Sequence, residues 1–207
     1  MKSFIFPIAV LAYFFSSSLF AQDVYADALS LKPNLDNGAR VYRLCAACHL
    51  QDGLGKKNGS FPVIASQHSS VIIKQLKDIQ KKYRKNPTMY PFSDPATIGG
   101  AQAMTDVAAY IQHLPGHNDN GVGTGKRLKE GRALYLNNCA ACHGLRGQGN
   151  AMNIFPKIKD QHYEYLLRQL KWIRDGYRIN GDPGMLILIK NMSDQDLADL
   201  ADYASRF

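Results

Sequence analysis

The five-residue stretch CAACH occurs twice in the chain, at Cys45–His49 and at Cys139–His143. The two copies contain all four cysteines of the 207 residues. The similarity continues beyond them, because Gln67–Arg84 aligns without a gap on Gln161–Arg178 at the same offset of 94 residues (139 minus 45). A repeat of this length exceeds the period of solenoid proteins, so the sequence predicts the duplication of a whole domain.

Each copy shows the same order of expected helices, and neither contains a convincing alternation of polar and apolar residues. We expect a helix that runs into the cysteines, a middle helix and a final helix. The expected bounds are Asp36–Ala47, a start near Ser66 and Gly100–His113 in the first copy, and Gly125–Ala141, a start near Asp160 and Ser193–Ser205 in the second. Gly38 and Gly131 are expected to let the first and last helices cross closely. The predicted fold class is all-α.

The first residues have the order of a secretory signal: Lys2, a short apolar run and a small residue at Ala21. The apolar run is shorter than the about 20 residues that span a bilayer, which favours a cleaved signal over an uncleaved anchor. We expect the signal at residues 1–21, with cleavage extending to 26 as the alternative, and export to the periplasm. The predicted domains are 30–114 and 126–207, joined by a Gly- and Asn-rich linker at 115–125.

The chain is basic, with 25 Lys and Arg residues against 17 Asp and Glu residues. A charge of this sign suggests nucleic acid, membrane or acidic protein partners, and export argues against nucleic acid. The positive charge is concentrated in Lys74–Lys85, whereas Ser193–Asp202 carries four acidic residues. We expect the basic segment either to attract an acidic redox partner or to be an ordinary solvated helix face.

Three kinds of site contain a C-x-x-C pattern. A redox disulfide does not need the following histidine and usually lies in a βαβ unit, which the sequence does not predict. A zinc site pairs two such patterns at about 15–20 residues, far closer than the repeat in this chain. Covalent haem attachment does need the histidine, because thiols one helical turn apart reach the two vinyl groups of the porphyrin while the imidazole faces the iron. We therefore predict two haem c groups, attached through Cys45, Cys48, Cys139 and Cys142, with His49 and His143 as iron ligands.

An electron-carrying haem needs a sixth ligand, and methionine is a ligand that raises its potential. Met185 follows a Gly- and Pro-containing loop before the last helix, and Met89 lies in the corresponding irregular loop of the first copy. We predict these two residues as the distal ligands. Met104 and Met192 occupy positions expected to pack in the core, and Met152 has no counterpart in the first copy.

Two further pairs of residues repeat at the same offset. His68 and His162 open the middle helices, where we expect a capping role and keep ligation of the iron as the alternative. Pro62 and Pro156 are placed to offer a backbone carbonyl to the second imidazole nitrogen of the iron-binding histidines. An ordinary turn proline is the alternative for this pair.

These features resemble the cytochrome c4 family, whose members are exported dihaem proteins made of two class I cytochrome c domains. The resemblance rests on the two C-x-x-C-H motifs, the paired Q-H…(K/R)-Q-L-K helices, the GYR stretch before a loop methionine and the closing SDQDLADLADY helix. It covers essentially the whole mature chain. It implies His49 and Met89 on one haem, His143 and Met185 on the other, and electrons passing between haems near the domain interface.

The function expected is that of a non-catalytic electron carrier between a respiratory donor and a terminal oxidase or reductase. Its partners would be redox proteins that are acidic or membrane-bound, and peripheral association with the membrane is compatible with this role. Two alternatives stay open: the cytochrome subunit of a flavocytochrome c-type sulfide dehydrogenase, and a dihaem enzyme such as a thiosulfate dehydrogenase or a peroxidase. The enzyme alternative needs an open or labile distal position on one haem.

Overall fold

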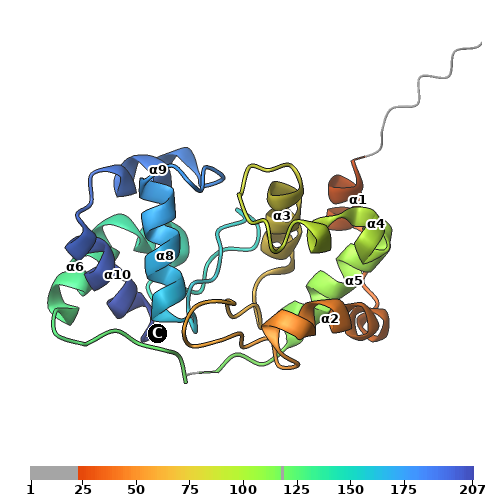
Figure 1. The fold of residues 1–207 in the computed structure, drawn as a ribbon, viewed down its shortest axis with the longest axis horizontal. Helices are drawn as coiled ribbons and strands as arrows, with labels where there is room; N and C mark the ends of the chain where they lie inside the picture. Colours follow the sequence, from red (N-terminus) through yellow and green to blue (C-terminus); the bar gives the residue numbers. More distant parts are fainter. Residues whose placement is uncertain (1–22, 118) are drawn as a thin grey trace, which may run out of the picture.

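A computed structural model describes residues 23–117 and 119–207, so the predicted signal peptide at 1–21 lies outside the described residues. Within them the secondary structure is helical, with two isolated bridges and no strand. The helices form two lobes, one on the right of Figure 1 and one on the left. The all-α prediction is therefore confirmed. No helix of the described residues is long and apolar enough to cross a membrane.

Each lobe contains one copy of the repeat. The first consists of α1 (Val24–Ser30), α2 (Leu35–His49), α3 (Ser69–Gln80), the short η1 (Pro91–Ser93) and α4 (Pro95–Ile98), and α5 (Gly100–His113). The second consists of α6 (Leu128–Asn138), α7 (Ala140–His143), α8 (Tyr163–Arg174), α9 (Pro183–Lys190) and α10 (Asp194–Ala204). The final helix of the first copy, α5, has the bounds that the sequence predicts.

In each lobe, the helix that leads to the CAACH motif crosses the last helix at a glycine, α2 crossing α5 and α6 crossing α10. A Cβ atom added at Gly38 would lie 2.2 Å from the carbonyl oxygen of Asp106, and one added at Gly131 would lie 2.2 Å from that of Asp199. A larger residue would push the helices apart, because a close-packed interior does not absorb such an overlap. The close crossing predicted for both copies is therefore confirmed.

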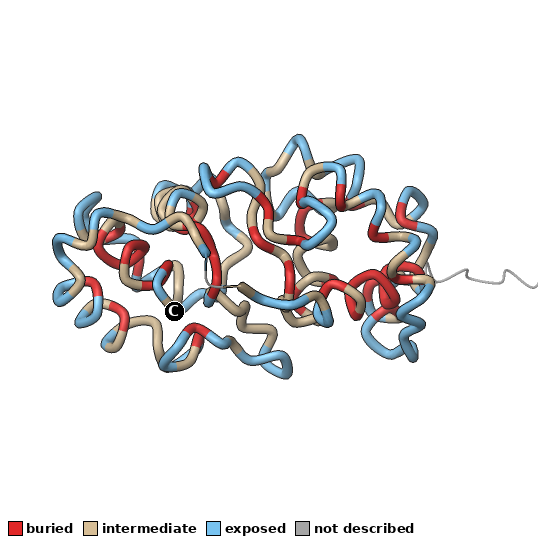
Figure 2. Tube along the Cα trace, turned by 90° about the horizontal axis from the view of Figure 1, so that it is seen from below, coloured by how far each residue is buried: buried red, intermediate tan, exposed pale blue. Residues whose placement is uncertain are grey.

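Each lobe has its own apolar core, and Figure 2 shows separate buried stretches in the two halves of the molecule. In the first lobe, Tyr42 of α2 and Met104 of α5 belong to one cluster, and the side chain of Met104 is fully buried. In the second lobe, Tyr135 and Leu197 are fully buried at the corresponding positions. The expected core role of Met104 is confirmed, although Tyr42 and Met104 share one cluster whereas Tyr135 and Leu197 belong to two.

The prediction of a helix over Gly125–Ala141 is wrong in two respects: the helix begins later, and it is interrupted before the end of the segment. Gly125 has a φ of 74° and donates its N–H to the carboxylate of Asp202, so the helix begins later, at Leu128. Cys139 has φ −120° and ψ −35°, which lie outside the helical region and divide the segment into α6 and α7. In the first lobe, by contrast, Cys45 lies inside the continuous helix α2.

The middle helices also begin later than the starts expected near Ser66 and Asp160. Both residues have positive φ angles, 56° and 64°, which a right-handed helix does not contain. In the last helix, Ser193 is the N-cap of α10, and its hydroxyl accepts a hydrogen bond from the N–H of Asp196. The helix ends at Ala204, within one residue of the expected bound.

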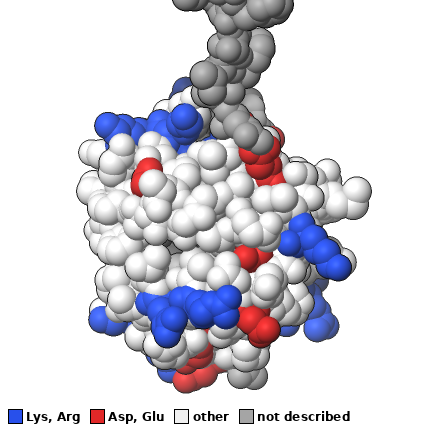
Figure 3. Space-filling model, turned by 90° about the vertical axis from the view of Figure 1, so that its right-hand side faces the viewer, with Lys and Arg blue, Asp and Glu red and all other residues white. Residues whose placement is uncertain are grey.

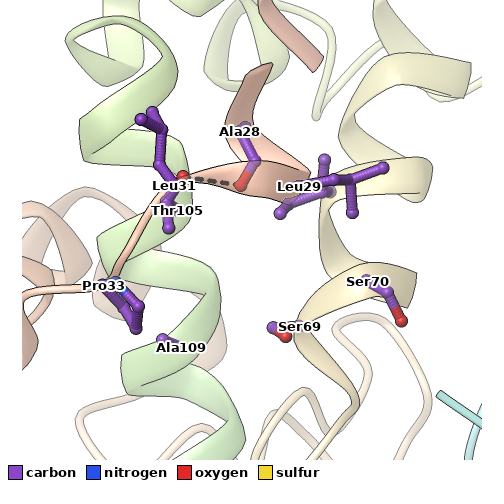
Figure 4. A pocket seen from close by; sticks show the side chains of 9 residues that line it. Ala28, Leu29, Leu31, Pro33, Ser69, Ser70, Thr105 and Ala109 are labelled. Atoms are coloured by element: carbon purple, nitrogen blue, oxygen red, sulfur yellow. Dashed lines mark hydrogen bonds between the residues drawn. The ribbon is translucent and has the colours of Figure 1, made fainter. Parts of the chain in front are cut away.

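The sequence did not indicate α1, which packs between α5 and α3 (Figure 4). The hydroxyl of Thr105 donates a hydrogen bond to the carbonyl oxygen of Ala28 (2.7 Å), drawn as a dashed line in Figure 4. Tyr25 is buried, and the Asp23 carboxylate accepts the N–H of Tyr25 as the N-cap of the helix. The first lobe therefore includes the chain from residue 23 onward.

The two lobes meet through hydrogen bonds that repeat with the sequence. Gln67 donates through Nε2 to the carbonyl oxygen of Lys157 (2.8 Å) and accepts the N–H of the same residue (2.9 Å). The equivalent Gln161 bonds in the same way to Val63, at 2.9 and 3.0 Å. Val63 and Lys157 are equivalent positions of the repeat, so each glutamine makes the same contact with the opposite domain. An approximate two-fold axis therefore relates the two domains.

Candidate haem sites

Each CAACH motif ends a helix and turns its histidine into the protein. His49 ends α2 and His143 ends α7, and their exposed fractions are only 5% and 8%. The Nδ1 atom of His49 lies 3.0 Å from the carbonyl oxygen of Pro62, and that of His143 lies 2.9 Å from the carbonyl oxygen of Pro156. Nδ1 is therefore the donor in each ring, which leaves the lone pair of Nε2 to bind a metal.

Burial lowers the pKa of both imidazoles below the ordinary value of a histidine. The positive charges of Arg84 and Arg178 lower it further, whereas the hydrogen bonds to the proline carbonyls raise it. The net shift of each pKa is downward, so both rings are neutral at pH 7. Neutral imidazole is the form that coordinates a metal.

The four cysteines are free thiols. Burial raises the pKa of Cys45 and that of Cys139 to about 11, whereas a redox-active C-x-x-C pair has a lowered thiol pKa. A zinc site needs several ligands together. No group of three or more His, Cys, Asp or Glu side chains within residues 23–117 and 119–207 is arranged to hold a metal ion. The geometry therefore favours neither of the two alternatives to haem attachment.

The methionines predicted as distal ligands lie in different local structures. Met185 is on α9, a helix that the sequence did not predict, and packs half-buried against an apolar cluster from α8, α9 and α10. Met89 lies half-buried in a turn before η1, with its N–H bonded to Asn86. Met192 is half-buried and packs against the apolar clusters of the second domain, and Met152 has 93% of its surface exposed.

The capping role expected for His68 and His162 is wrong. Each residue stands at the N-cap of its middle helix without a capping hydrogen bond from its side chain. Instead, Nε2 of His68 lies 2.9 Å from the carbonyl oxygen of Gln148, and Nε2 of His162 lies 2.8 Å from that of Leu54. Both carbonyls belong to the loop that follows the CAACH motif of the other domain. The two histidines therefore join the domains.

Comparison with known proteins agrees with this arrangement. The family model described as Cytochrome c matches residues 35–115 and 128–205. A cytochrome c4 from Thiocapsa roseopersicina is 30% identical over 175 residues, which cover 80% of this chain and 88% of that protein. The crystal structure of reduced cytochrome c4 from Pseudomonas stutzeri matches with a TM-score of 0.74 at 29% identity, covering 84% of this chain and 99% of that one. The chain belongs to the cytochrome c4 family.

Membership of the cytochrome c4 family implies covalently bound haem c, and the two CAACH motifs fit two haems. The described residues fit the group as well, because each motif combines free thiols with a buried imidazole whose Nε2 is available. A thiosulfate dehydrogenase from Marichromatium purpuratum also matches, with a TM-score of 0.69 at 23% identity. This cytochrome c4-type chain covers 40% of that protein, and the likeness concerns the fold alone.

Sequence reasoning missed two arginines at the interface of this cytochrome c4-type chain. Arg84 and Arg178 form an isolated antiparallel bridge, and Arg84 Nη2 donates to the hydroxyl of Tyr165 (2.6 Å). Burial, followed by the charge of Arg84, lowers the pKa of Arg178 to about 9. Both arginines are half-buried, and the carboxylates of haem have the charge that would pair with such cations. The identity of the two arginines in the aligned repeat was the only signal in the sequence.

Proposed function

We propose that this chain is a periplasmic dihaem electron carrier with His–Met ligation at both irons. His49 and Met89 bind one iron, and His143 and Met185 bind the other. The thioether bonds come from Cys45, Cys48, Cys139 and Cys142. The observation that carries the proposal is the repeated buried histidine, held by a proline carbonyl through Nδ1 in both domains.

The chain's own residues position and protect the cofactor. Pro62 and Pro156 fix the tautomer and the ring orientation of the two iron-binding imidazoles. Haem supplies the one-electron chemistry when it is bound. A methionine in the sixth position closes the iron to small molecules, and this supports a carrier rather than an enzyme. No catalytic residue is part of the proposal.

The hydrogen bonds between the domains support electron transfer from one haem to the other. His68 and His162 each tie a middle helix to the loop after the opposite CAACH motif. The paired bonds of Gln67 and Gln161 add a second set of contacts across the same two-fold axis. This cross-bonding opposes rotation of one domain against the other. Haems held at His49 and His143 would therefore keep one separation, on which the rate of electron transfer between them would depend.

A basic surface beside Met89 is the proposed contact for an acidic redox partner. We define it by the exposed Lys81, Lys82 and Lys85. Seen from the side of the first domain, lysine and arginine side chains lie in separate groups with much uncharged surface between them (Figure 3). Charges of one sign around a docking surface steer the encounter with a partner of the opposite sign. A membrane-bound oxidase, reductase or dehydrogenase with an acidic face would satisfy this requirement.

Only part of the basic run Lys74–Lys85 is available to a partner. Lys74 is bonded to Asp78 in the next turn of α3, and Lys77 is bonded to Asp23. These two lysines therefore contribute to the first domain itself. The basic surface of Lys81, Lys82 and Lys85 is what remains for docking.

The described residues support one of the two expected cleavage positions of the signal. Cleavage after Ala26 would remove Asp23 and Tyr25, which cap α1 and fill the core of the first domain. Cleavage after Ala21 keeps both. We therefore propose 1–21 as the signal, 30–114 together with α1 as the first haem domain, 126–207 as the second, and 115–125 as their linker.

Spectroscopy of the purified protein tests the carrier function. We expect two haems per chain, both low-spin in the oxidised protein by electron paramagnetic resonance, and full reversible reduction without consumption of substrate. A high-spin haem combined with turnover of thiosulfate would establish an enzyme in place of a carrier.

A further inference from the structure

An open cavity of about 390 Å³ lies in the second domain, between α6, α10 and the loop that follows His143. Four cationic side chains line it together with the ring of Tyr203, and they are Arg132, Arg146, Lys159 and Arg206. Among the described residues, no Asp or Glu lines this cavity. None of its lining residues belongs to a CAACH motif or to the proposed iron ligands. Haem binding therefore does not account for its charge.

Three of the four cations lack a carboxylate partner among residues 23–117 and 119–207. Arg206 donates to the carboxylate of Asp202 (2.9 Å) and to the carbonyl oxygen of Gly123 (2.8 Å). In the part of the chain that the structure describes, no Asp or Glu side chain forms an ion pair with Arg132, Arg146 or Lys159. Cations gathered around a concave surface raise the local potential and attract anions.

The first domain provides an internal control, because three of the four cationic positions carry no cation there and the fourth, Arg206, corresponds to His113. The offset is 93 residues (131 minus 38) in the helices that cross, where Gly131 corresponds to Gly38, and 94 residues between them. The repeat therefore places Ala39, Asp52 and Ala65 where the second domain has Arg132, Arg146 and Lys159. Tyr203, which also lines the cavity, corresponds to another tyrosine in the first domain, Tyr110. The fold of a haem domain therefore does not require these cations, and a role other than folding must explain them.

We propose that this cavity binds an oxyanion of the phosphate class. Guanidinium groups hold phosphate oxygens through paired, charge-assisted hydrogen bonds, which suits a cavity with three arginines. Two sources share this chemistry, the free ion and the phosphate headgroup of an anionic lipid. Leu136 and the exposed Leu145 line the same cavity and offer apolar contacts beside the cations. The inference is independent of the redox partners and of the iron ligands proposed above.

Calorimetric titration of the haem-loaded protein with inorganic phosphate, at constant ionic strength, tests the free ion. The pocket variant R132A/R146D/K159A carries the residues of the first domain at these positions. The control variant K81D/K82G/K85I carries the residues of the second domain at Asp175, Gly176 and Ile179, and it loses the same formal charge. We expect saturable binding by the wild type and the control, and an affinity lower by about tenfold or more in the pocket variant.

Sedimentation with vesicles tests the lipid source in the same three proteins. Binding to phosphatidylglycerol vesicles but not to phosphatidylcholine vesicles, lost only in the pocket variant, would assign the site to a lipid headgroup. Binding of inorganic phosphate alone would assign it to the free ion. The proposal is overturned if neither probe binds, or if the two variants lose binding equally, because total charge would then explain the effect. Unchanged haem content and near-UV circular dichroism confirm that the variants fold.

Discussion

The two domains differ most around the predicted distal methionines. In the first, Met89 lies in a turn next to exposed lysines, whereas in the second Met185 lies on α9 beside Ile187 and Leu188, which are 72% and 46% exposed. Around the buried histidines the domains are alike, with Nδ1–carbonyl distances of 3.0 and 2.9 Å. Duplication has kept the positions that attach and orient haem and has changed those that a partner protein would touch.

The charged groups show the same division. The basic surface of the first domain corresponds to Asp175, Gly176 and Ile179 in the second. There, Arg174 is bonded to both Asp175 and Asp194, so neighbouring charges neutralise each other. Beside the predicted distal methionines, therefore, the first domain offers unpaired charge and the second offers apolar side chains, while the unpaired cations of the second domain lie elsewhere, around the cavity of Arg132, Arg146 and Lys159.

Removal of the anchoring thiols should have the largest effect and should be alike in both domains. We expect Cys45→Ala/Cys48→Ala and Cys139→Ala/Cys142→Ala each to lower the covalent haem content from two to one per chain. The domain without haem should also lose its fold, because a domain of this size depends on its cofactor as a staple. Mass spectrometry counts the haems, and circular dichroism reports the helix content. Two covalent haems remaining in either variant would contradict the role of the cysteines.

Substitution of the crossing glycines should give the next largest effect, again in both domains. Gly38→Ala and Gly131→Ala place a Cβ atom 2.2 Å from a carbonyl oxygen of the crossing helix. We expect each to lower the free energy of unfolding by about 1–3 kcal/mol or more, as overpacking of a core does. Denaturant titration measures the change. Ala133→Ser, at an exposed position of α6, is the matched control and should change stability little.

Substitution of the two interface glutamines should lower the stability less than substitution of the glycines, and by different amounts in the two domains. Gln161 is buried, whereas Gln67 is only half-buried, so the backbone groups left by Gln161→Ala have less access to water. We expect a loss of about 1–3 kcal/mol for Gln161→Ala and less for Gln67→Ala. In calorimetric unfolding, the melting temperatures of the two domains should differ more in the variants than in the wild type. Equal losses would show that the interface is more symmetric in energy than in burial.

The smallest expected effect is on the encounter with a charged partner. The variant K81D/K82G/K85I should slow reduction by an acidic flavodoxin at low salt, because the basic surface steers that encounter. The difference from the wild type should vanish at high ionic strength. Stopped-flow kinetics over a range of salt concentrations measures it. The pocket variant R132A/R146D/K159A loses the same charge elsewhere, and equal slowing in both variants would refute a local docking surface.

The repeat and its chemistry could be predicted from sequence because they depend on local spacing. The two C-x-x-C-H motifs, the helix period and the glycines at the crossings are all readable in single segments. The role of His68 could not be predicted, because its partner Gln148 lies in the other domain. The break between α6 and α7 at Cys139 could not be predicted either. The same five-residue motif occurs in the continuous helix α2, so the motif does not distinguish a broken helix from a continuous one. Helix α9 was missed because its glycine and proline residues indicated a loop.

Spectroscopy of the methionine variants tests His–Met ligation most directly. Met89→Ala and Met185→Ala should each remove about half of the methionine–iron(III) charge-transfer band, and the two losses together should account for the whole band. Met152→Ala, at a position with 93% of its surface exposed, is the control and should leave the band unchanged. Survival of the full band in either Met89→Ala or Met185→Ala would contradict the assignment of that distal ligand.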